Sequence, residues 1–395
     1  MWERGGVLDV VLHPGRDRSL RRRHPWVLSG AVARVEGEAE PGAWARVQSA
    51  EGETLGFGHW SPMSQIRVRM LAFGKEPPGD ELLVERVARA VARRAADPLL
   101  ADTDGVRLVN AEGDGLPGLV ADRYGDVVVA KLSSAGMALR RELLARALRE
   151  ASGAACALER ADAPAARREG IAAREGPLWG APPESPVPLH ERGRHYVADL
   201  RHGQKTGFYL DQRDARDLVQ RIAAGRRVLD VFAYSGGFAV AAARGGATSV
   251  RLVDASAEAL RLAERHLAEN APAVPASLHE ADGFRFLREE RGVYDLLLLD
   301  PPPLARRKAD VSRAARAHKD ALLSALRRAA PDAFLLCFSC SHHVDATLLR
   351  QIVFGASLDA GRSLQVLGEL GTPSDHPVSL DHPEGVYLKG LWLRA

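Results

Sequence analysis

Runs of apolar residues that stop abruptly at polar or turn-forming residues mark the last third of the chain. The two clearest are DLLLLD, which ends at Asp300, and AFLLCFSC, which ends at Cys340. A parallel strand buried on both faces is expected to show such a continuous apolar run. Because open α/β sheets bind ligands at the carboxyl ends of their strands, the two runs predict an acid and a thiol at one ligand-binding edge. That pair favours covalent chemistry on a substrate over binding alone.

From about residue 200 onward, predicted strands alternate with predicted helices. Strands are expected in RRVLDVFAY, SVRLVDAS, YDLLLLD and AFLLCFSC, and helices in GFAVAAARGG, AEALRLAERHLAEN and the basic segment after Asp300. This alternation implies a right-handed parallel sheet. LQVLGELG and GVYLKGLWL then predict two strands with no helix between them, so a terminal antiparallel hairpin. We therefore expect an α/β fold over residues 191–395, with the Rossmann-like sheet of class I methyltransferases.

Two smaller modules are predicted ahead of that sheet. Residues 1–75 form a β-rich module, with two strands around the EGE turn of WARVQSAEGETLGFGHW and a third in SQIRVRMLAF. Residues 76–190 begin with the helical pattern of DELLVERVARAVARRAADPLL and continue as strands separated by turns, a second helix in ALRRELLARALRE and another strand pair. This order predicts a small central α+β domain. PLWGAPPESPVP is either a linker or the tip of a long hairpin.

Composition fits a globular protein with two or three domains. The chain has 395 residues, of which 46% are hydrophobic and 27% are charged. No apolar run approaches the roughly 18 residues of a membrane helix, and the first residues lack the layout of a signal peptide. Three cysteines are too few for a disulfide framework. We expect a cytoplasmic protein with reduced thiols and no membrane partner.

Positive charge is concentrated in two stretches, although the net charge is only +3. Six arginines and one acid lie between His13 and Arg34, and eight Lys or Arg and two Asp lie between Pro301 and Ala330. A single basic run is most often a solvated face. Two such runs, one directly after the DPP motif, favour an anionic partner such as a phosphate backbone.

The segment VLDVFAYSGGF predicts a cofactor-binding turn between a strand and a helix. Gly236 and Gly237 let the backbone approach a ligand at the helix N-terminus. Asp254 closes the next strand, as needed to hold ribose hydroxyls. A nicotinamide site has similar spacing, but the third glycine of its G-x-G-x-x-G pattern is missing, so S-adenosyl-L-methionine fits better. Asp282 is expected either to meet an adenine amino group or to cap the following helix, with Phe284 beside the ring.

The segment GQKTGFYLDQRDAR, just before this sheet, is expected to pack over the cofactor. The candidate cofactor-binding residues lie in this segment and at the ends of the strands that follow. They are Phe208, Asp211, Gln212, Asp230, Phe232, Tyr234, Ser235, Gly236, Asp254, Asp282, Gly283, Phe284 and Asp300.

Asp300 and Cys340 are the candidate catalytic residues. Pro301 and Pro302 fix the chain after the strand and remove two backbone donors, which holds Asp300 in place. Strand alternation predicts that Cys337 is buried, whereas Cys340 follows the apolar run and can be exposed and ionisable. The C-x-x-C spacing and the histidines behind it also suggest a zinc site. Since no second C-x-x-C exists, we expect no metal.

These segments together resemble bacterial 23S rRNA 5-methylcytosine methyltransferases, which combine a PUA domain, a central domain and a Rossmann-like domain. RRRHPWVLSGAV and SPMSQIRVR resemble the PUA part, and NAEGDGLPGLVADRYGD resembles the central part. GQKTGFYLDQR, VLDVFAYSGGFAV, DPP, FSCSHHV and HPEGVYLKG resemble the catalytic part. The resemblance covers essentially the whole chain. One departure is Pro303, where relatives often carry lysine or another polar residue.

The resemblance implies a reaction in which Cys340 adds to carbon 6 of cytosine and S-adenosyl-L-methionine methylates carbon 5. Asp300 would bind ring nitrogen 3 and the amino group. The base that removes the carbon-5 proton is not assigned. The implied partner is 23S rRNA or a large-subunit precursor, with a homodimer left open. The candidate RNA-binding residues are Arg21, Arg22, Arg23, Arg67, Arg306, Arg307 and Lys308.

Three other functions use the same fold. A methyltransferase acting on a guanine nitrogen of rRNA would need no nucleophilic cysteine. A non-catalytic ribosome assembly factor would keep the fold without the reaction. A small-molecule or protein methyltransferase is disfavoured by the PUA-like module.

Overall fold

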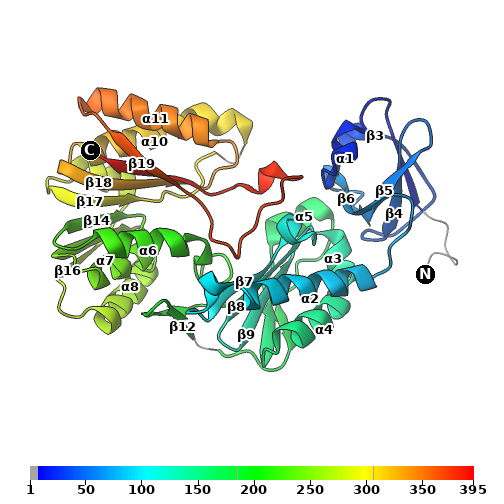
Figure 1. The fold of residues 1–395 in the computed structure, drawn as a ribbon, viewed down its shortest axis with the longest axis horizontal. Helices are drawn as coiled ribbons and strands as arrows, with labels where there is room; N and C mark the ends of the chain where they lie inside the picture. Colours follow the sequence, from blue (N-terminus) through cyan, green and yellow to red (C-terminus); the bar gives the residue numbers. More distant parts are fainter. Residues whose placement is uncertain (1–7, 185, 306) are drawn as a thin grey trace. The chain divides into compact units, whose positions relative to one another are not determined.

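The computed structural model describes residues 8–184, 186–305 and 307–395, which form two compact units (Figure 1). Unit 1 comprises Met1–Leu189, Ala198–Leu210 and Ser374–Gly385. Unit 2 comprises the intervening segments, His190–Val197, Asp211–Pro373 and Val386–Ala395. Two short segments from the C-terminal half of the sequence therefore pack with the N-terminal half.

A seven-stranded sheet forms the core of unit 2, in the order β16-β15-β14-β17-β18-β20-β19. The first five strands in this order are parallel, and β20 runs antiparallel to both β18 and β19. This arrangement confirms the predicted α/β class and the terminal antiparallel hairpin. The strands are β14 (Arg227–Val231), β15 (Ser249–Asp254), β16 (Ala276–Glu280), β17 (Tyr294–Leu299), β18 (Ala329–Ser339), β19 (Gln365–Leu370) and β20 (Lys389–Arg394).

Helices cover both faces of this sheet, with α10 and α11 on one face and α6, α7 and α8 on the other (Figure 1). Their coverage explains the continuous apolar runs, because the central strands must be buried on both sides. Leu296 and Leu297 of β17 are completely buried. The helices are α6 (Arg213–Ile222), α7 (Gly237–Arg244), α8 (Ala257–Asn270), α9 (Gly283–Glu289), α10 (Val311–Leu326) and α11 (Ala346–Ala360).

Two elements of unit 2 escaped the sequence analysis. The edge strand β16 carries half-exposed residues, so its pattern is polar and does not look like that of a central strand. The helix α11 has an apolar face that includes Ile352 and Val353, together with exposed Phe354 and Leu358. Of the helices in the described parts of the chain, none is long and apolar enough to cross a membrane.

Unit 1 begins with a six-stranded sheet in the order β2-β6-β5-β4-β1-β3. Its core contains Val10, Val47 and Val68, all completely buried. The predicted strands around the EGE turn are present as β4 and β5, and the third is present as β6. The elements are β1 (Leu8–Leu12), α1 (Arg18–Arg21), β2 (Trp26–Leu28), β3 (Val32–Glu36), β4 (Trp44–Gln48), β5 (Thr54–Trp60) and β6 (Ile66–Phe73).

A second sheet of unit 1 has the order β11-β10-β9-β8-β7, and α2 and α4 pack together against it. The predicted alternation of strands and helices is present, but α5 was not anticipated. The elements are α2 (Glu81–Ala95), β7 (Gly105–Asn110), β8 (Leu119–Tyr124), β9 (Val127–Leu132), α3 (Ala135–Leu139), α4 (Arg141–Ser152), β10 (Cys156–Glu159), α5 (Ala163–Glu169) and β11 (Gly176–Trp179). A separate two-stranded ladder joins β12 (Val187–Glu191) and β13 (Arg194–Ala198).

Buried hydrogen bonds hold the segment Ser374–Gly385 within unit 1. The Arg94 guanidinium donates to the Asp375 carbonyl at 2.8 Å while pairing with the Asp114 carboxylate. The Arg107 backbone N–H donates to the Asp375 carboxylate at 3.0 Å. The Asn110 side-chain amide donates to the Pro377 carbonyl at 2.9 Å. This connection between β19 and β20 is therefore an integral part of unit 1.

The centre of the seven-stranded sheet predicts a large cost for cavity formation. Leu297 is completely buried between the two helical layers, so Leu297→Ala should lower the free energy of unfolding by about 2–5 kcal/mol. Leu380→Ala is the matched control, because Leu380 is fully exposed and its truncation should change that free energy by less than about 0.5 kcal/mol. Urea unfolding measures both. Equal destabilisation by the two substitutions would contradict the assigned burial.

Candidate active site

Asp300 and Cys340 lie at the same edge of the seven-stranded sheet. They directly follow β17 and β18, which are parallel neighbours with Leu299 opposite Cys337. A hydrogen bond also joins the loops after the two strands, because the Ala305 backbone N–H donates to the Ser341 hydroxyl at 3.2 Å. The structure therefore brings the predicted acid and the predicted thiol to one site, although 40 positions separate them in the sequence.

The two cysteines near this edge have different surroundings. Cys337 lies within β18 and is only 3% exposed, and burial raises the pKa of its thiol to about 12. Cys340 lies after the end of the strand and is partly exposed. A thiol must reach both its thiolate form and a substrate to act as a nucleophile. Of these two cysteines, Cys340 alone meets the requirement for access.

Asp300 is oriented by the segment that precedes α6. The Gln212 side-chain amide donates to the Asp300 carboxylate at 2.8 Å. The neighbouring Asp211 carboxylate accepts a hydrogen bond from the Tyr387 hydroxyl at 2.6 Å. Asp211 and Gln212 are buried, so both bonds are shielded from water. These two candidate cofactor residues thus help to build the edge of the sheet at which Asp300 lies.

Lys389 is a residue of this edge that the sequence analysis missed. It is the cross-strand partner of Ser339, the last residue of β18. Its ammonium donates to the carbonyl of Ser341 at 2.8 Å and to that of Tyr387 at 2.9 Å. A lysine at the start of a strand whose next four residues are Gly, Leu, Trp and Leu was a signal for this site, since a buried charge requires partners.

The glycine turn after β14 has an unusual backbone. Phe232, Tyr234 and Gly236 have φ values of 67°, 48° and 74°, respectively. The Asp254 carboxylate fixes this turn by accepting hydrogen bonds from the backbone N–H groups of Tyr234 at 2.8 Å and Ser256 at 2.9 Å. Left-handed conformations at non-glycine residues store strain and occur often at functional sites. Asp254 therefore shapes the loop on which a cofactor would rest.

Asp230 at the end of β14 is completely surrounded by protein and accepts a hydrogen bond from the Ala239 backbone N–H at 3.2 Å. The pKa of this carboxyl is raised to about 8, because burial and the nearby Asp300 and Asp254 raise it more than the hydrogen bond from Ala239 lowers it. Because Asp230 interacts electrostatically with both Asp300 and Asp254, the three acids lie near one another at the sheet edge. A ligand with hydroxyl donors and positive charge fits this group, and S-adenosyl-L-methionine carries both.

Two aromatic rings, Phe232 after β14 and Phe284 at the start of α9, lie next to each other. The Phe232 and Phe284 rings lie 5.0 Å apart. A Cβ added at Gly283 would approach the Phe232 ring to 2.6 Å, so glycine is needed at this close approach. Asp282 accepts a hydrogen bond from the Arg285 backbone N–H at 2.8 Å and thus caps α9, as one of its two interpretations predicted. These residues suit the adenine end of the same ligand.

Phe208 belongs to unit 1, whereas the other candidate cofactor residues belong to unit 2. Its backbone exchanges hydrogen bonds with the buried Tyr124 hydroxyl. Within the described parts of the chain, no group of three or more His, Cys, Asp or Glu residues could hold a metal ion. Cys337, Cys340 and the histidines after them therefore form no such group.

The candidate RNA-binding cations differ in their availability. Arg21 forms ion pairs with Asp17 and Glu53, both at 2.6 Å. Arg22 and Arg23 are exposed on the adjacent turn. The remaining candidates are Arg67 in β6 and the three basic residues after the DPP motif. Arg67 donates to the Pro62 carbonyl, Arg307 pairs with Asp310 at 3.3 Å, Lys308 is exposed, and Arg306 lies outside the described residues.

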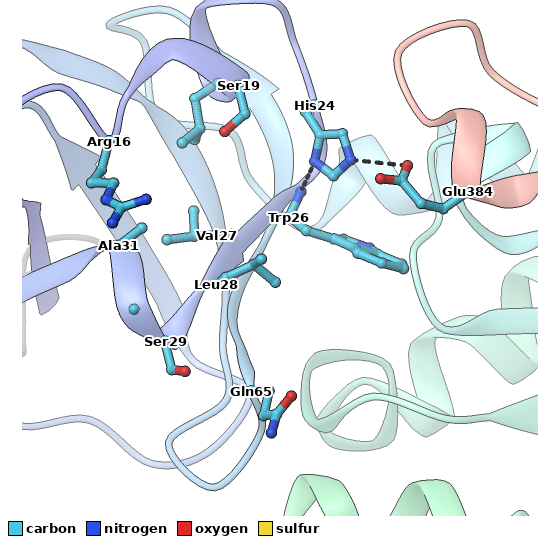
Figure 2. Close-up of a pocket in the computed structure, with 12 residues that line it drawn as sticks. Arg16, Ser19, His24, Trp26, Val27, Leu28, Ser29, Ala31, Gln65 and Glu384 are labelled. Atoms are coloured by element: carbon cyan, nitrogen blue, oxygen red, sulfur yellow. Dashed lines mark hydrogen bonds and ion pairs between the residues drawn. The ribbon is translucent and has the colours of Figure 1, made fainter. Parts of the chain in front are cut away.

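A cavity of about 570 Å³ opens beside β2 in unit 1, and Figure 2 shows the side chains that line it. The Nδ1 atom of His24 accepts a hydrogen bond from the Trp26 backbone N–H at 3.2 Å, and its Nε2 atom lies 3.1 Å from the Glu384 carboxylate. The Trp26 ring contacts His382, with ring centroids 4.5 Å apart. Arg16 and Gln65 add polar groups to the lining. Aromatic faces beside cations and amides are suited to an unpaired nucleotide.

Asp230 predicts a pH-dependent stability. Its pKa is about 8 in the folded chain and about 3.9 in an unfolded one, so the folded state holds an extra proton between these values. The stabilisation is complete below about pH 4 and is lost as the pH rises through about 8. Between pH 5 and 7, the free energy of unfolding of the wild type should fall by about 1.4 kcal/mol per pH unit relative to Asp230→Asn.

Urea unfolding at several pH values measures this difference. The matched control is Asp282→Asn, because Asp282 is exposed and its loss should leave the wild-type slope nearly unchanged. Parallel pH profiles for the wild type and Asp230→Asn would contradict the assigned protonation of Asp230.

Sequence comparisons agree with this architecture. The sequence model of a PUA-like domain matches residues 10–73, and that of an S-adenosylmethionine-dependent methyltransferase matches residues 137–337. Ribosomal RNA large subunit methyltransferase I of Aeromonas salmonicida is 41% identical, over 98% of this chain and 99% of that protein. The protein of the same name from Shewanella amazonensis is 42% identical over the same shares of the two chains.

Two solved structures cover 98% of this chain and 100% of their own, each at 21% identity. One is a protein from Streptococcus mutans assigned as a SAM-dependent methyltransferase, with a TM-score of 0.82. The other, assigned as a methyltransferase and complexed with SAH, has a TM-score of 0.84. At this identity the likeness supports the fold alone. The domain matches confirm the predicted PUA-like domain, the methyltransferase sheet and S-adenosylmethionine as the cofactor of the family. The chain belongs to the S-adenosylmethionine-dependent methyltransferase family that includes the ribosomal RNA large subunit methyltransferases I.

Proposed function

We propose that this protein methylates carbon 5 of a cytosine in 23S rRNA, through a covalent adduct between Cys340 and the base. The observation that carries the proposal is the convergence of Cys340 and Asp300 at the sheet edge that also holds the predicted cofactor loops. The names of the full-length relatives support large-subunit ribosomal RNA as the substrate.

The chemistry explains why a thiol is required. Carbon 5 of cytosine is a poor nucleophile until a thiolate adds to carbon 6. That addition forms the sulfur–carbon bond and shifts the electron pair of the 5,6 double bond, so that carbon 5 becomes enamine-like. Carbon 5 would then bond to the electrophilic methyl group of S-adenosylmethionine, whose sulfur keeps the electrons of the broken carbon–sulfur bond and leaves as S-adenosylhomocysteine. Loss of the carbon-5 proton to a base then restores the double bond and expels Cys340 as a thiolate.

Asp300 would bind the target ring through nitrogen 3 and the exocyclic amino group. A protonated nitrogen 3 or an amino group donates to a carboxylate, which offsets the charge that develops when the thiolate adds. The hydrogen bond from Gln212 fixes one carboxylate oxygen and thereby limits rotation of the Asp300 side chain. The target base must be unpaired or flipped out of a helix to reach this edge.

The basic turn and the cavity of the PUA-like domain would bind RNA outside the reacting nucleotide. Arg22 and Arg23 are exposed and suit phosphates, which position an RNA without specifying its sequence. The cavity beside Trp26 has the size and the aromatic lining that suit one unpaired nucleotide.

The reaction is tested in cells that lack this protein, by bisulfite sequencing of their 23S rRNA. Wild-type protein should restore protection of one cytosine, whereas Cys340→Ala should restore none, because the adduct cannot form. Cys156→Ala is the matched control and should restore protection, since Cys156 is buried in the central domain.

Restoration by Cys340→Ala would refute the thiol mechanism. If no cytosine lost protection in the deletion strain, methylation of a guanine nitrogen or a role in ribosome assembly would replace the proposal. Mass spectrometry of the same rRNA would distinguish these two, because only the first changes a methylated guanine.

The RNA-binding role predicts unequal effects for neighbouring arginines. The double variant Arg22→Gln/Arg23→Gln should weaken binding to a 23S rRNA fragment. The slope of the logarithm of the binding constant against the logarithm of the salt concentration should become shallower by about 1 to 2, since two phosphate contacts are lost. Arg21→Gln is the matched control, because its guanidinium is already paired with Asp17 and Glu53. Filter binding at several salt concentrations measures both. An equal loss with Arg21→Gln would contradict the assignment.

A further inference from the structure

Lys389 occupies a position from which its charge can act on Cys340. The backbone of Lys389 lies opposite Ser339, and its ammonium reaches the carbonyl of Ser341 at 2.8 Å. Cys340 is the residue between these two. The lysine side chain therefore runs past Cys340, and its charge interacts electrostatically with this residue.

The fold fixes the direction of this side chain. Two carbonyl oxygens, those of Ser341 and Tyr387, accept hydrogen bonds from the ammonium, which leaves one of its three donors for another group. Lys389 is 7% exposed, so its charge is poorly screened by water. A lysine that served only to fill space would not need this arrangement, since an apolar residue would fill the strand at lower cost.

We propose that Lys389 is a positioning residue that holds the Cys340 thiol in its thiolate form. The proposal rests on the proposed function, in which that thiolate attacks the target base. In addition to the nucleophile, the reaction would then need a fixed cation, and the terminal strand β20 supplies it. The same cation is ready to stabilise the thiolate again when Cys340 leaves the methylated base.

Other charged and titratable groups surround Cys340. Asp300 follows β17, His342 and His343 follow Cys340 in the same loop, and Asp345 caps the start of α11. Burial lowers the pKa of Lys389, whereas its interactions with Cys340 and Asp345 raise it. The interaction with Cys340 is reciprocal, because an ammonium that is stabilised by a thiolate stabilises that thiolate equally. Lys389 supplies a cation that is fixed by two hydrogen bonds of its own.

The first measurement is the pH dependence of alkylation of Cys340 in the wild-type protein. Iodoacetamide is used as the probe, and mass spectrometry resolves the three cysteines. The midpoint for Cys340 should lie at least one pH unit below the ordinary thiol value of about 8.5. A midpoint at or above that value would overturn the proposal without the use of any variant.

Lys389→Met removes the charge and keeps most of the side-chain volume. It should raise the midpoint by one pH unit or more, which reduces the alkylation rate at pH 7 about tenfold. Lys389→Arg retains a cation and should keep the midpoint below 8.5. Lys319→Met is the matched control, because Lys319 pairs with Asp359 on a partly exposed surface of α10 and should leave the profile unchanged.

The outcomes separate this proposal from the proposed function. An unchanged midpoint in folded Lys389→Met would refute the role of Lys389, whatever base the enzyme modifies. A raised midpoint combined with full methylation by Cys340→Ala would leave the lysine–thiolate pair intact and refute the cytosine mechanism. If Lys389→Met does not fold, the wild-type midpoint and that of Lys389→Arg decide the proposal.

Discussion

The parallel pairing of β17 with β18 is the constraint on which the candidate active site depends. The register of this pair places Leu299, the last residue of β17, opposite Cys337, which lies two residues before the end of β18. Asp300 and Cys340 must then emerge on the same edge of the sheet. The buried leucines of β17 and the helices on both faces hold this pair of strands in the core. Core packing thus determines the geometry of the reactive groups.

Burial gives two cysteines and two aspartates near this edge different pKa values or different exposure. Cys337 is enclosed by the core, which raises the pKa of its thiol to about 12, whereas Cys340 lies past the strand and is partly exposed. Asp230 is enclosed and has a pKa raised to about 8, while Asp254 uses its carboxylate to hold the cofactor turn. The proposed reaction would use one accessible thiol and several acids with separate roles, and the boundary of the core separates these groups.

The terminal hairpin contributes to both units. Its strand β20 brings Lys389 to the loop that carries Cys340, and Tyr387 just before it binds Asp211. The connection between β19 and β20 belongs to unit 1, where Asp375 and Pro377 accept hydrogen bonds from the central domain. One stretch of chain therefore serves the candidate catalytic edge and the domain that precedes it in the sequence.

The sequence by itself determined the order of strands and helices, the parallel sheet with its terminal hairpin and the location of Asp300 and Cys340 at strand ends. These features follow from apolar periodicity and turn residues, which are local properties of the chain. It did not identify the edge strand β16 or the helix α5, where half-exposed or short elements give weak patterns, and it also missed the helix α11, which carries exposed apolar residues. The tertiary structure alone decided that Gln212 orients Asp300, that Arg21 is paired with Glu53, and that Lys389 binds the Ser341 carbonyl next to Cys340. Such pairings join residues that are far apart in the sequence, and their energies depend on burial and distance, which exist only once the chain has folded.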